Sequence, residues 1–581
     1  MPIWILRRLE KRDRNNLGCA RGRAGIGDTH QEDAGTRSAQ IRNPGIVLLV
    51  SRVMESPEFT PNEPPGKERV RLPETEKSPV AKPSIRSIRW AQTLILVAVY
   101  SVPALICVRM GTIADLDLWW HLRSAEWITQ HGALPQTDPF SAVVGRPWVA
   151  YSWLFELMVF QLFRWFGLAG AVIYSTVMVA STTVLMHRMT RRLQIDFSMG
   201  ALLALTASLC LVRLYSPRSW WFTILFFVLE IDLLLQARKN GKQRRLMWLP
   251  VIFALWANLH ILFVYGLLVL ALALAETVLA RWWKGIEVRT RSGWLAGIFA
   301  ASLLATLANP YGWKIYQVAY GLAGQSGALD KVGELSALPF RRIDDWGALL
   351  LVLAATGVLA RTRRFAFFES VLLAIAIYIS FRSQRDVWVV VIAASAILAE
   401  GLKGDEKNRS ALTAWATPFV AVGAGFLVWL GFWTMQVNNT QLRTTLAENM
   451  PVRAVEVVRE KGWTGPLYND YNWGGYRIWA LRIPVSIDGR QNIYGDEWID
   501  RSNSTWTGQP GWDSDPDLAK AGLVIGPVKL PLTQLLRMDP RFQLVYEDKL
   551  AAVFVARRNL ISTAATAPAA ESATATHDSV K

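Results

Sequence analysis

The stretch ADLDLWWHLRSAEWITQHGALPQTDPFSAVVGRPW, residues 114–148, is a polar loop that follows the first strongly apolar segment of the chain. A chain that returns repeatedly to a membrane seldom places a loop of about this length and charge between apolar segments without using it. We therefore take this loop as the functional face of a membrane protein and interpret the other segments by their relation to it. Its candidate side chains are Asp115, Asp117, Trp119, Trp120, His121, Glu126, His131 and Asp138.

The composition favours a polytopic membrane protein with a soluble part. The 581 residues are 52% hydrophobic, include 27 Trp and carry a formal net charge of +17. Lys and Arg gather in the loops between apolar segments, where they set orientation, and no Arg-rich face with interleaved aromatic residues indicates binding to nucleic acid. Cys19, Cys107 and Cys210 form no CxxC pair, so the sequence predicts neither a cysteine metal site nor a disulfide framework.

Eleven apolar segments predict eleven membrane spans, although several are shorter than the ~20 residues that an apolar helix needs to cross a bilayer. The segment 149–165 is not counted among them, because it is apolar but carries Glu156, Gln161 and Arg164. The predicted spans are residues 90–110, 168–187, 197–213, 219–236, 246–259, 261–281, 293–308, 346–360, 366–381, 386–402 and 412–435.

The charges between the spans decide how segment 149–165 is placed. If it lies at the membrane interface as an amphipathic helix, six basic stretches of the chain fall on one side. Basic loops stay in the cytoplasm, so we expect a cytoplasmic N-terminus, an extracytoplasmic C-terminus and an external loop at 111–167.

The fold class that follows is mainly α: a polytopic helical bundle with a small extracytoplasmic α/β domain at the C-terminus. We predict a disordered N-terminal region at 1–88, a transmembrane domain at 89–436, the α/β domain at 437–557 and a disordered Ala/Thr/Ser-rich tail at 558–581. Strands are expected in GPLYND, PVSIDG, AGLVIGP and the hairpin FQLVYED/AAVFVAR, and short helices in YNWGGYRIWAL and PLTQLLRM.

Asp115 and Asp117 lie just beyond the end of the first span. Two carboxylates at positions i and i+2 can bind a hard divalent cation such as Mg²⁺ or Mn²⁺, and one of them can instead act as a base toward a hydroxyl group. The alternative is a pair of solvated acids at a helix end. His121 and His131 are more often structural when they lie beside Trp, and the spacings that bind zinc are missing from the sequence.

A second group of polar residues lies at the predicted outer ends of later spans. Arginine at these positions is unexpected, because the other basic residues of the chain gather on the predicted cytoplasmic side. A guanidinium at the membrane interface can hold a phosphate or pyrophosphate through paired hydrogen bonds. The alternative is that each arginine reaches toward lipid headgroups. The group consists of Arg213, Arg218, Asn258, His260, Asn309, Arg382 and Arg385.

The pattern Asp–x–Asp–x–aromatic–aromatic–His, followed by a helix, a Gly turn and a second acidic turn, resembles the first external loop of the C-type (GT-C) membrane glycosyltransferases. This class includes the catalytic subunit of oligosaccharyltransferase, the protein O-mannosyltransferases and the aminoarabinose transferases. The order of the loop 114–148, the segment 149–165 and the span 168–187 matches the class, and FGLAGAVIYSTVMVASTTVLMHRMTRR (166–192) is similar to its second span.

The resemblance implies roles for individual residues. Asp117 is the first choice for the essential acid and Asp115 the second, with Asp138 and Glu334 as further metal ligands. The segment 468–498 is similar to the acceptor-reading segment of oligosaccharyltransferases, although Tyr468 and Asn469 stand where that family has two Trp; the alternative there is a strand–helix–strand core. The candidates for contact with acceptor or sugar are Trp119, Trp120, His121, Asp470, Tyr471, Tyr476, Asp488 and Arg490.

The function expected from this resemblance is transfer of a sugar from a polyprenyl phosphate or diphosphate to a glycan, lipid or protein acceptor at the outer face of a bacterial inner or plasma membrane. The partners would be the lipid-linked donor and membrane lipids, with a divalent metal as cofactor and no nucleic acid. One alternative is a non-catalytic protein that binds or scaffolds envelope lipids and tolerates loss of Asp115 and Asp117. A transporter is less favoured, because the sequence shows no two similar halves.

Overall fold

The computed structural model describes residues 84–559 except 144, 284, 287, 325–331, 363–365 and 413–415. Nearly all of the predicted disordered regions 1–88 and 558–581 lie outside the described residues. The first helix, α1 (Ile85–Met110), begins where the Ser84 hydroxyl accepts a hydrogen bond from the Ser87 backbone N–H at 3.1 Å. It ends at Gly111, whose φ of 51° is left-handed backbone that glycine adopts without strain.

Each of the eleven predicted apolar segments contains a helix. Among the residues that the structure describes, five of these helices (α1, α4, α6, α12 and α15) are long and apolar enough to cross a membrane. The count of eleven crossings stays a prediction. The other ten helices are α4 (Leu168–Leu193), α5 (Phe197–Cys210), α6 (Trp220–Asn240), α7 (Leu249–Leu259), α8 (Phe263–Leu279), α9 (Ser292–Ala305), α12 (Ile343–Arg361), α13 (Phe367–Arg382), α14 (Val387–Gly401) and α15 (Ala416–Thr434).

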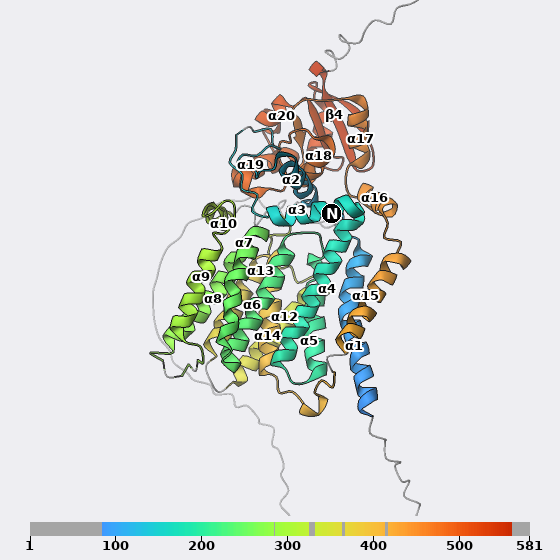
Figure 1. The fold of residues 1–581 in the computed structure, drawn as a ribbon. Helices are drawn as coiled ribbons and strands as arrows, with labels where there is room; N and C mark the ends of the chain where they lie inside the picture. Colours follow the sequence, from blue (N-terminus) through green and yellow to red (C-terminus); the bar gives the residue numbers. More distant parts are fainter. Residues whose placement is uncertain are drawn as a thin grey trace, which may run out of the picture. The chain divides into compact units, whose positions relative to one another are not determined.

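The helix α14 is the centre of the bundle. Every residue from 387 to 399 is buried, and the helix contacts α4, α5, α6, α12 and α13. A helix that is apolar on all faces is stable only when other apolar groups surround it. By contrast, α1 and α15 pair at the edge of the bundle (Figure 1) and leave Trp90, Phe419 and Trp433 exposed. Exposed aromatic side chains of this kind suit a hydrocarbon environment better than water.

Two short helices, α2 (Leu118–His131) of the polar loop and α3 (Trp153–Phe166) of the apolar segment that follows it, lie between the bundle and the C-terminal sheet (Figure 1). The helix α3 has 14 residues and runs across the ends of the bundle helices. At 1.5 Å per residue its length is about 21 Å, less than the ~30 Å thickness of a hydrocarbon core. Its placement at a membrane interface remains a prediction, and this length agrees with it.

The C-terminal part contains a four-stranded sheet of order β1–β2–β4–β3. The strand β1 (Leu467–Asn469) is parallel to β2 (Leu523–Pro527), which pairs antiparallel with β4 (Ala551–Ala556). The strand β3 (Phe542–Glu547) forms the predicted hairpin with β4. The helices of this part are α16 (Asn439–Ala447), α17 (Val452–Lys461), α18 (Gly474–Leu481), α19 (Gln491–Trp506), α20 (Pro516–Lys520) and α21 (Pro531–Met538).

The predicted strand at PVSIDG is wrong. Its Val485 makes isolated bridges to Ser141 and to Leu467 at the start of β1, but residues 484–489 form no continuous strand. The physical reason is local: the Asp488 carboxylate accepts a hydrogen bond from the Arg490 backbone N–H at 2.9 Å, which turns the chain where a strand would continue.

Candidate active site

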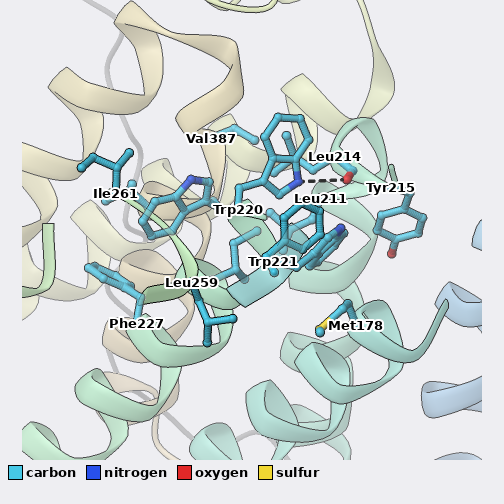
Figure 2. Packing of buried hydrophobic residues seen from close by; sticks show 14 of the residues in the cluster. Met178, Leu211, Leu214, Tyr215, Trp220, Trp221, Phe227, Leu259, Ile261 and Val387 are labelled. Atoms are coloured by element: carbon cyan, nitrogen blue, oxygen red, sulfur yellow. Dashed lines mark hydrogen bonds between the residues drawn. The ribbon is translucent and has the colours of Figure 1, made fainter. Parts of the chain in front are cut away.

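A cavity of about 300 Å³ lies at the end of the bundle that faces the C-terminal part. Its walls come from the start of α2, the starts of α6 and α8, the helix α10 (Lys314–Gly324), the end of α13 and the segment 489–492. Two lining residues, Trp220 and Ile261, are labelled within the hydrophobic packing in Figure 2, where Trp220 donates a hydrogen bond to the Leu214 carbonyl at 3.3 Å. The polar residues that line it include Asp117, His121, Arg218, His260, Glu334, Arg382 and Arg385.

The centre of this polar group is Arg218, which contacts three carboxylates. Its Nε donates to Asp115 Oδ2 at 2.7 Å, and its Nη1 donates to Asp117 and, at 3.2 Å, to Glu334 Oε1. Burial lowers the pKa of Arg218, but the three carboxylates outweigh it and hold the pKa well above its usual range. The structure thus brings together three predicted acids and one predicted phosphate-binding arginine from segments far apart in the sequence.

The two aspartates of the DLD motif face different surroundings. Asp115 Oδ1 accepts hydrogen bonds from the backbone N–H groups of Asp117 and Leu118 at 2.9 and 3.2 Å, and its Oδ2 is bound to Arg218. Asp115 therefore holds the backbone at the entrance to α2, whereas Asp117 lines the cavity. The pKa of Asp117 is raised to about 6: burial is the largest cause, the Arg218 guanidinium acts against it, and the neighbouring carboxylates of Glu334 and Asp115 add to it. Asp117 is the aspartate of this motif that a molecule in the cavity would meet.

A buried histidine–carboxylate pair stands beside Asp117. His121 Nδ1 lies 3.1 Å from Glu156 Oε1, and the Ser124 hydroxyl donates to Glu156 Oε2 at 2.5 Å. The His121 ring is also 3.6 Å from the Trp120 ring, centre to centre. A carboxylate bound to one ring nitrogen fixes the tautomer and orientation of an imidazole. Sequence reasoning did not assign Glu156 to the site, although an acid inside an apolar segment indicates a buried partner.

The predicted phosphate-binding residues divide into two sets. His260, Arg382 and Arg385 line the cavity together with Arg218, and His260 Nδ1 lies 2.8 Å from the Thr223 hydroxyl. Burial lowers the pKa of Arg385, but the carboxylates of Asp386 and Glu334 outweigh it and hold the pKa above its usual range.

Arg213 lies outside this set of cavity-lining residues. It donates to Asp344 Oδ2 at 3.2 Å, to Gln384 Oε1 at 2.8 Å and to Asp345. These three acceptors hold its guanidinium in a separate network, so it does not join the arginines that face the cavity.

Asp138 does not join the other predicted metal ligands. Its carboxylate accepts hydrogen bonds from Arg490 at 2.5 and 3.3 Å, and Arg490 also binds Asp488, whose second oxygen accepts from Tyr494 at 2.7 Å. Burial raises the pKa of Asp138, but the Arg490 guanidinium outweighs it and holds the pKa below its usual range. This buried cluster joins the polar loop to the C-terminal part and lies apart from Asp117 and Glu334.

Of the remaining candidates for sugar or acceptor contact, Trp119 and Tyr476 pack together between α2 and the C-terminal part, whereas Tyr471 and Asp470 make their contacts within the C-terminal part. The Tyr476 ring packs on the Trp119 ring at 5.0 Å, and the Tyr471 hydroxyl donates to the Gly489 carbonyl at 3.5 Å. Burial raises the pKa of Asp470, against the opposing charge of Arg477. None of these four predicted residues is among those that line the cavity; Gly489, Gln491 and Asn492, which sequence reasoning did not single out, take that place.

The residues present do not fit a divalent metal. Among the described residues no group of three or more His, Cys, Asp or Glu side chains is arranged to hold a metal ion. The predicted ligands Asp115, Asp117 and Glu334 all point at the Arg218 guanidinium, and Asp138 is bound to Arg490. A cation of the protein thus already occupies the place where these oxygens converge.

Structural comparison finds membrane glycosyltransferases of the C type, the class that the loop 114–148 resembles. The chain is similar to the archaeal oligosaccharyltransferase AglB from Archaeoglobus fulgidus in complex with an inhibitory peptide and a dolichol-phosphate, with a TM-score of 0.48, 12% identity, and coverage of 76% of this chain and 70% of that chain. It is also similar to ArnT from Cupriavidus metallidurans bound to undecaprenyl phosphate, with a TM-score of 0.46, 13% identity, and coverage of 80% and 97%.

No family model matches the sequence, and no curated protein gives a significant match.

Proposed function

We propose that this chain is a membrane glycosyltransferase that moves a sugar from a polyprenyl phosphate or diphosphate to an acceptor at the extracytoplasmic face. The observation that carries the proposal is the cavity in which the Asp117 carboxyl lies beside Arg218, with Arg382 and Arg385 in the same lining. A carboxyl group with a pKa near neutrality and several guanidinium groups are the parts needed to activate a hydroxyl and to bind a phosphate.

In this proposal the arginines hold the donor phosphate and Asp117 faces the acceptor. The acceptor hydroxyl gives its proton to the Asp117 carboxylate as its oxygen bonds to the anomeric carbon of the sugar. The bond between that carbon and the phosphate oxygen breaks, and the lipid phosphate leaves with the electron pair. Fixed guanidinium charges stabilise the developing negative charge without reorganisation.

The walls of the cavity are suited to a lipid-linked donor. Beside the charged groups the lining includes apolar side chains from α8, α10 and α13, among them Val264, Leu322 and Ile379. The apolar side chains would contact the isoprenoid chain of the donor, and the arginines would bind its phosphate. The cavity therefore offers a matching surface to both parts of a lipid-linked donor.

The direction of α6 supports an extracytoplasmic site. This helix begins at the cavity with Trp220 and carries Arg238 and Lys239 in its last turn, about 28 Å away at 1.5 Å per residue. Basic residues at the end of a span favour the cytoplasmic side, so the cavity belongs to the opposite side.

The test is transfer by the purified protein in proteoliposomes with a panel of labelled polyprenyl-phosphate sugars. Asp117→Asn should abolish transfer while the protein still purifies as a folded monodisperse species. Exchange of Asp548, which binds backbone N–H groups in the distant β-hairpin, for Asn serves as the matched control. An Asp117→Asn rate equal to that of the native protein would contradict the mechanism and favour a non-catalytic lipid-binding protein.

A further inference from the structure

The convergence of three acids on one guanidinium distinguishes this cavity from a metal site. Asp115 uses Oδ1 for backbone N–H groups and Oδ2 for Arg218, so both of its oxygens are engaged. Asp117 and Glu334 bind the same nitrogen, Nη1. A divalent ion held by this trio would need their oxygens to converge on it, and the guanidinium lies at that point of convergence.

The position of Arg218 is fixed from several sides. Its guanidinium carbon lies 4.9 Å from the centre of the Trp220 ring, its backbone carbonyl accepts a hydrogen bond from the Tyr174 hydroxyl at 2.8 Å, and its backbone N–H donates to the Ser216 carbonyl at 2.9 Å. The residue is buried. Arg218 is therefore a packed part of the cavity wall, unlike a surface arginine that could swing out to admit an ion.

We propose that the Arg218 guanidinium stands where a divalent cation would stand among Asp115, Asp117 and Glu334, and that the site works without a metal ion. An arginine in a protein stays protonated, so it supplies a permanent positive charge at a fixed place. A dication bound to the same oxygens would lie within a few ångströms of that charge and be repelled by it. In transfer, and here the inference rests on the function proposed above, Arg218 would offset charge on the donor phosphate.

The first experiment measures Mn²⁺ binding to the full chain, purified in detergent micelles, by the loss of the free Mn²⁺ signal in electron paramagnetic resonance. We expect no saturable binding that depends on Asp117. One Mn²⁺ bound per native chain, and lost in Asp117→Asn, would overturn the proposal. The measurement uses no sugar donor, so its outcome is separate from success or failure of the proposed transfer reaction.

The second experiment removes the guanidinium and keeps the acids. Arg218→Met has a side chain of similar length without charge, and the vacated space should now admit Mn²⁺, with an affinity at least about tenfold above that of the native chain. The double variant Arg218→Met/Asp117→Asn should lose this gain. A folded Arg218→Met protein that binds no more Mn²⁺ than the native chain would also overturn the proposal. If Arg218→Met does not fold, the comparison of Mn²⁺ binding between the native chain and Asp117→Asn still tests the proposal.

Discussion

Replacement of Arg490 by Met should strongly destabilise the junction between the polar loop and the C-terminal part. The guanidinium is 1% exposed and makes four hydrogen bonds, two to Asp138 at 2.5 and 3.3 Å and two to Asp488 at 2.8 and 2.7 Å. Its removal leaves two buried carboxylates without their shared cation. Breaking a buried ion pair from one side costs about 3–5 kcal/mol, so we expect a loss of this size in the free energy of unfolding.

The chain offers a matched control in Arg482, which also joins the C-terminal part to the polar loop, through Glu126. Its side chain is 42% exposed, and solvent screens such a pair, so Arg482→Met should cost about 1 kcal/mol or less. Thermal unfolding of both purified variants, followed by tryptophan fluorescence in the same detergent, gives the comparison. Equal shifts in midpoint for the two variants, or a larger shift for Arg482→Met, would refute this account of burial.

The cluster of Asp138, Arg490 and Asp488 also predicts how the stability of the folded chain changes with pH. The pKa of Asp138 is below its usual range in the folded chain, so the folded state binds fewer protons there than the unfolded state. The stability that this carboxylate contributes is present above its ordinary pKa of about 4 and is lost as the pH falls through the lower folded value. Unfolding midpoints measured from pH 7 downward should show a loss below about pH 4 that is smaller in Asp138→Asn.

Three further predictions concern the cavity. Because the pKa of Asp117 is raised to about 6, transfer that needs its carboxylate should increase as the pH rises from about 5 to 7, and a rate that is flat over this interval would contradict the role. A Cβ on Gly489 would overlap the Asp117 carboxylate, so Gly489→Ala should lower kcat/KM by about 10²-fold at unchanged expression. Glu156→Leu leaves His121 and Ser124 without their buried acceptor and should cost about 1–3 kcal/mol in urea unfolding, more than Glu156→Gln does.

Hydropathy located the helices because it is a local property of the sequence. Each apolar segment contains a helix, and the polar loop between the first two spans does contribute to the cavity. Which charges Arg213 and Arg218 meet is set by packing between segments more than a hundred positions apart. Arg213 and Arg218 look equivalent in the sequence, yet one binds Asp344 and the other Asp115, and no local pattern distinguishes them.

The same limit applies to the acids. Asp138 follows a turn in the same loop as Asp117, which made it a reasonable metal ligand, but its partner Arg490 lies 352 positions away. The segment PVSIDG has the alternation of a strand, and a single side chain–backbone hydrogen bond at Asp488 turns it away from the sheet. The sequence shows Glu156 as an acid in an apolar segment. Its pairing with His121 depends on the packing of α3 on α2, which only the structure shows.

The contribution of residues 489–492 to the cavity has a consequence for how the protein is made. Synthesis proceeds from the N-terminus, so all the bundle helices emerge from the ribosome before this segment exists. A nascent chain can thus carry its whole acid and arginine set yet present an unroofed pocket, open to water and to unselected hydroxyl groups. For the transferase proposed above, the cavity would therefore be complete only after the last portion of the chain has folded over the bundle.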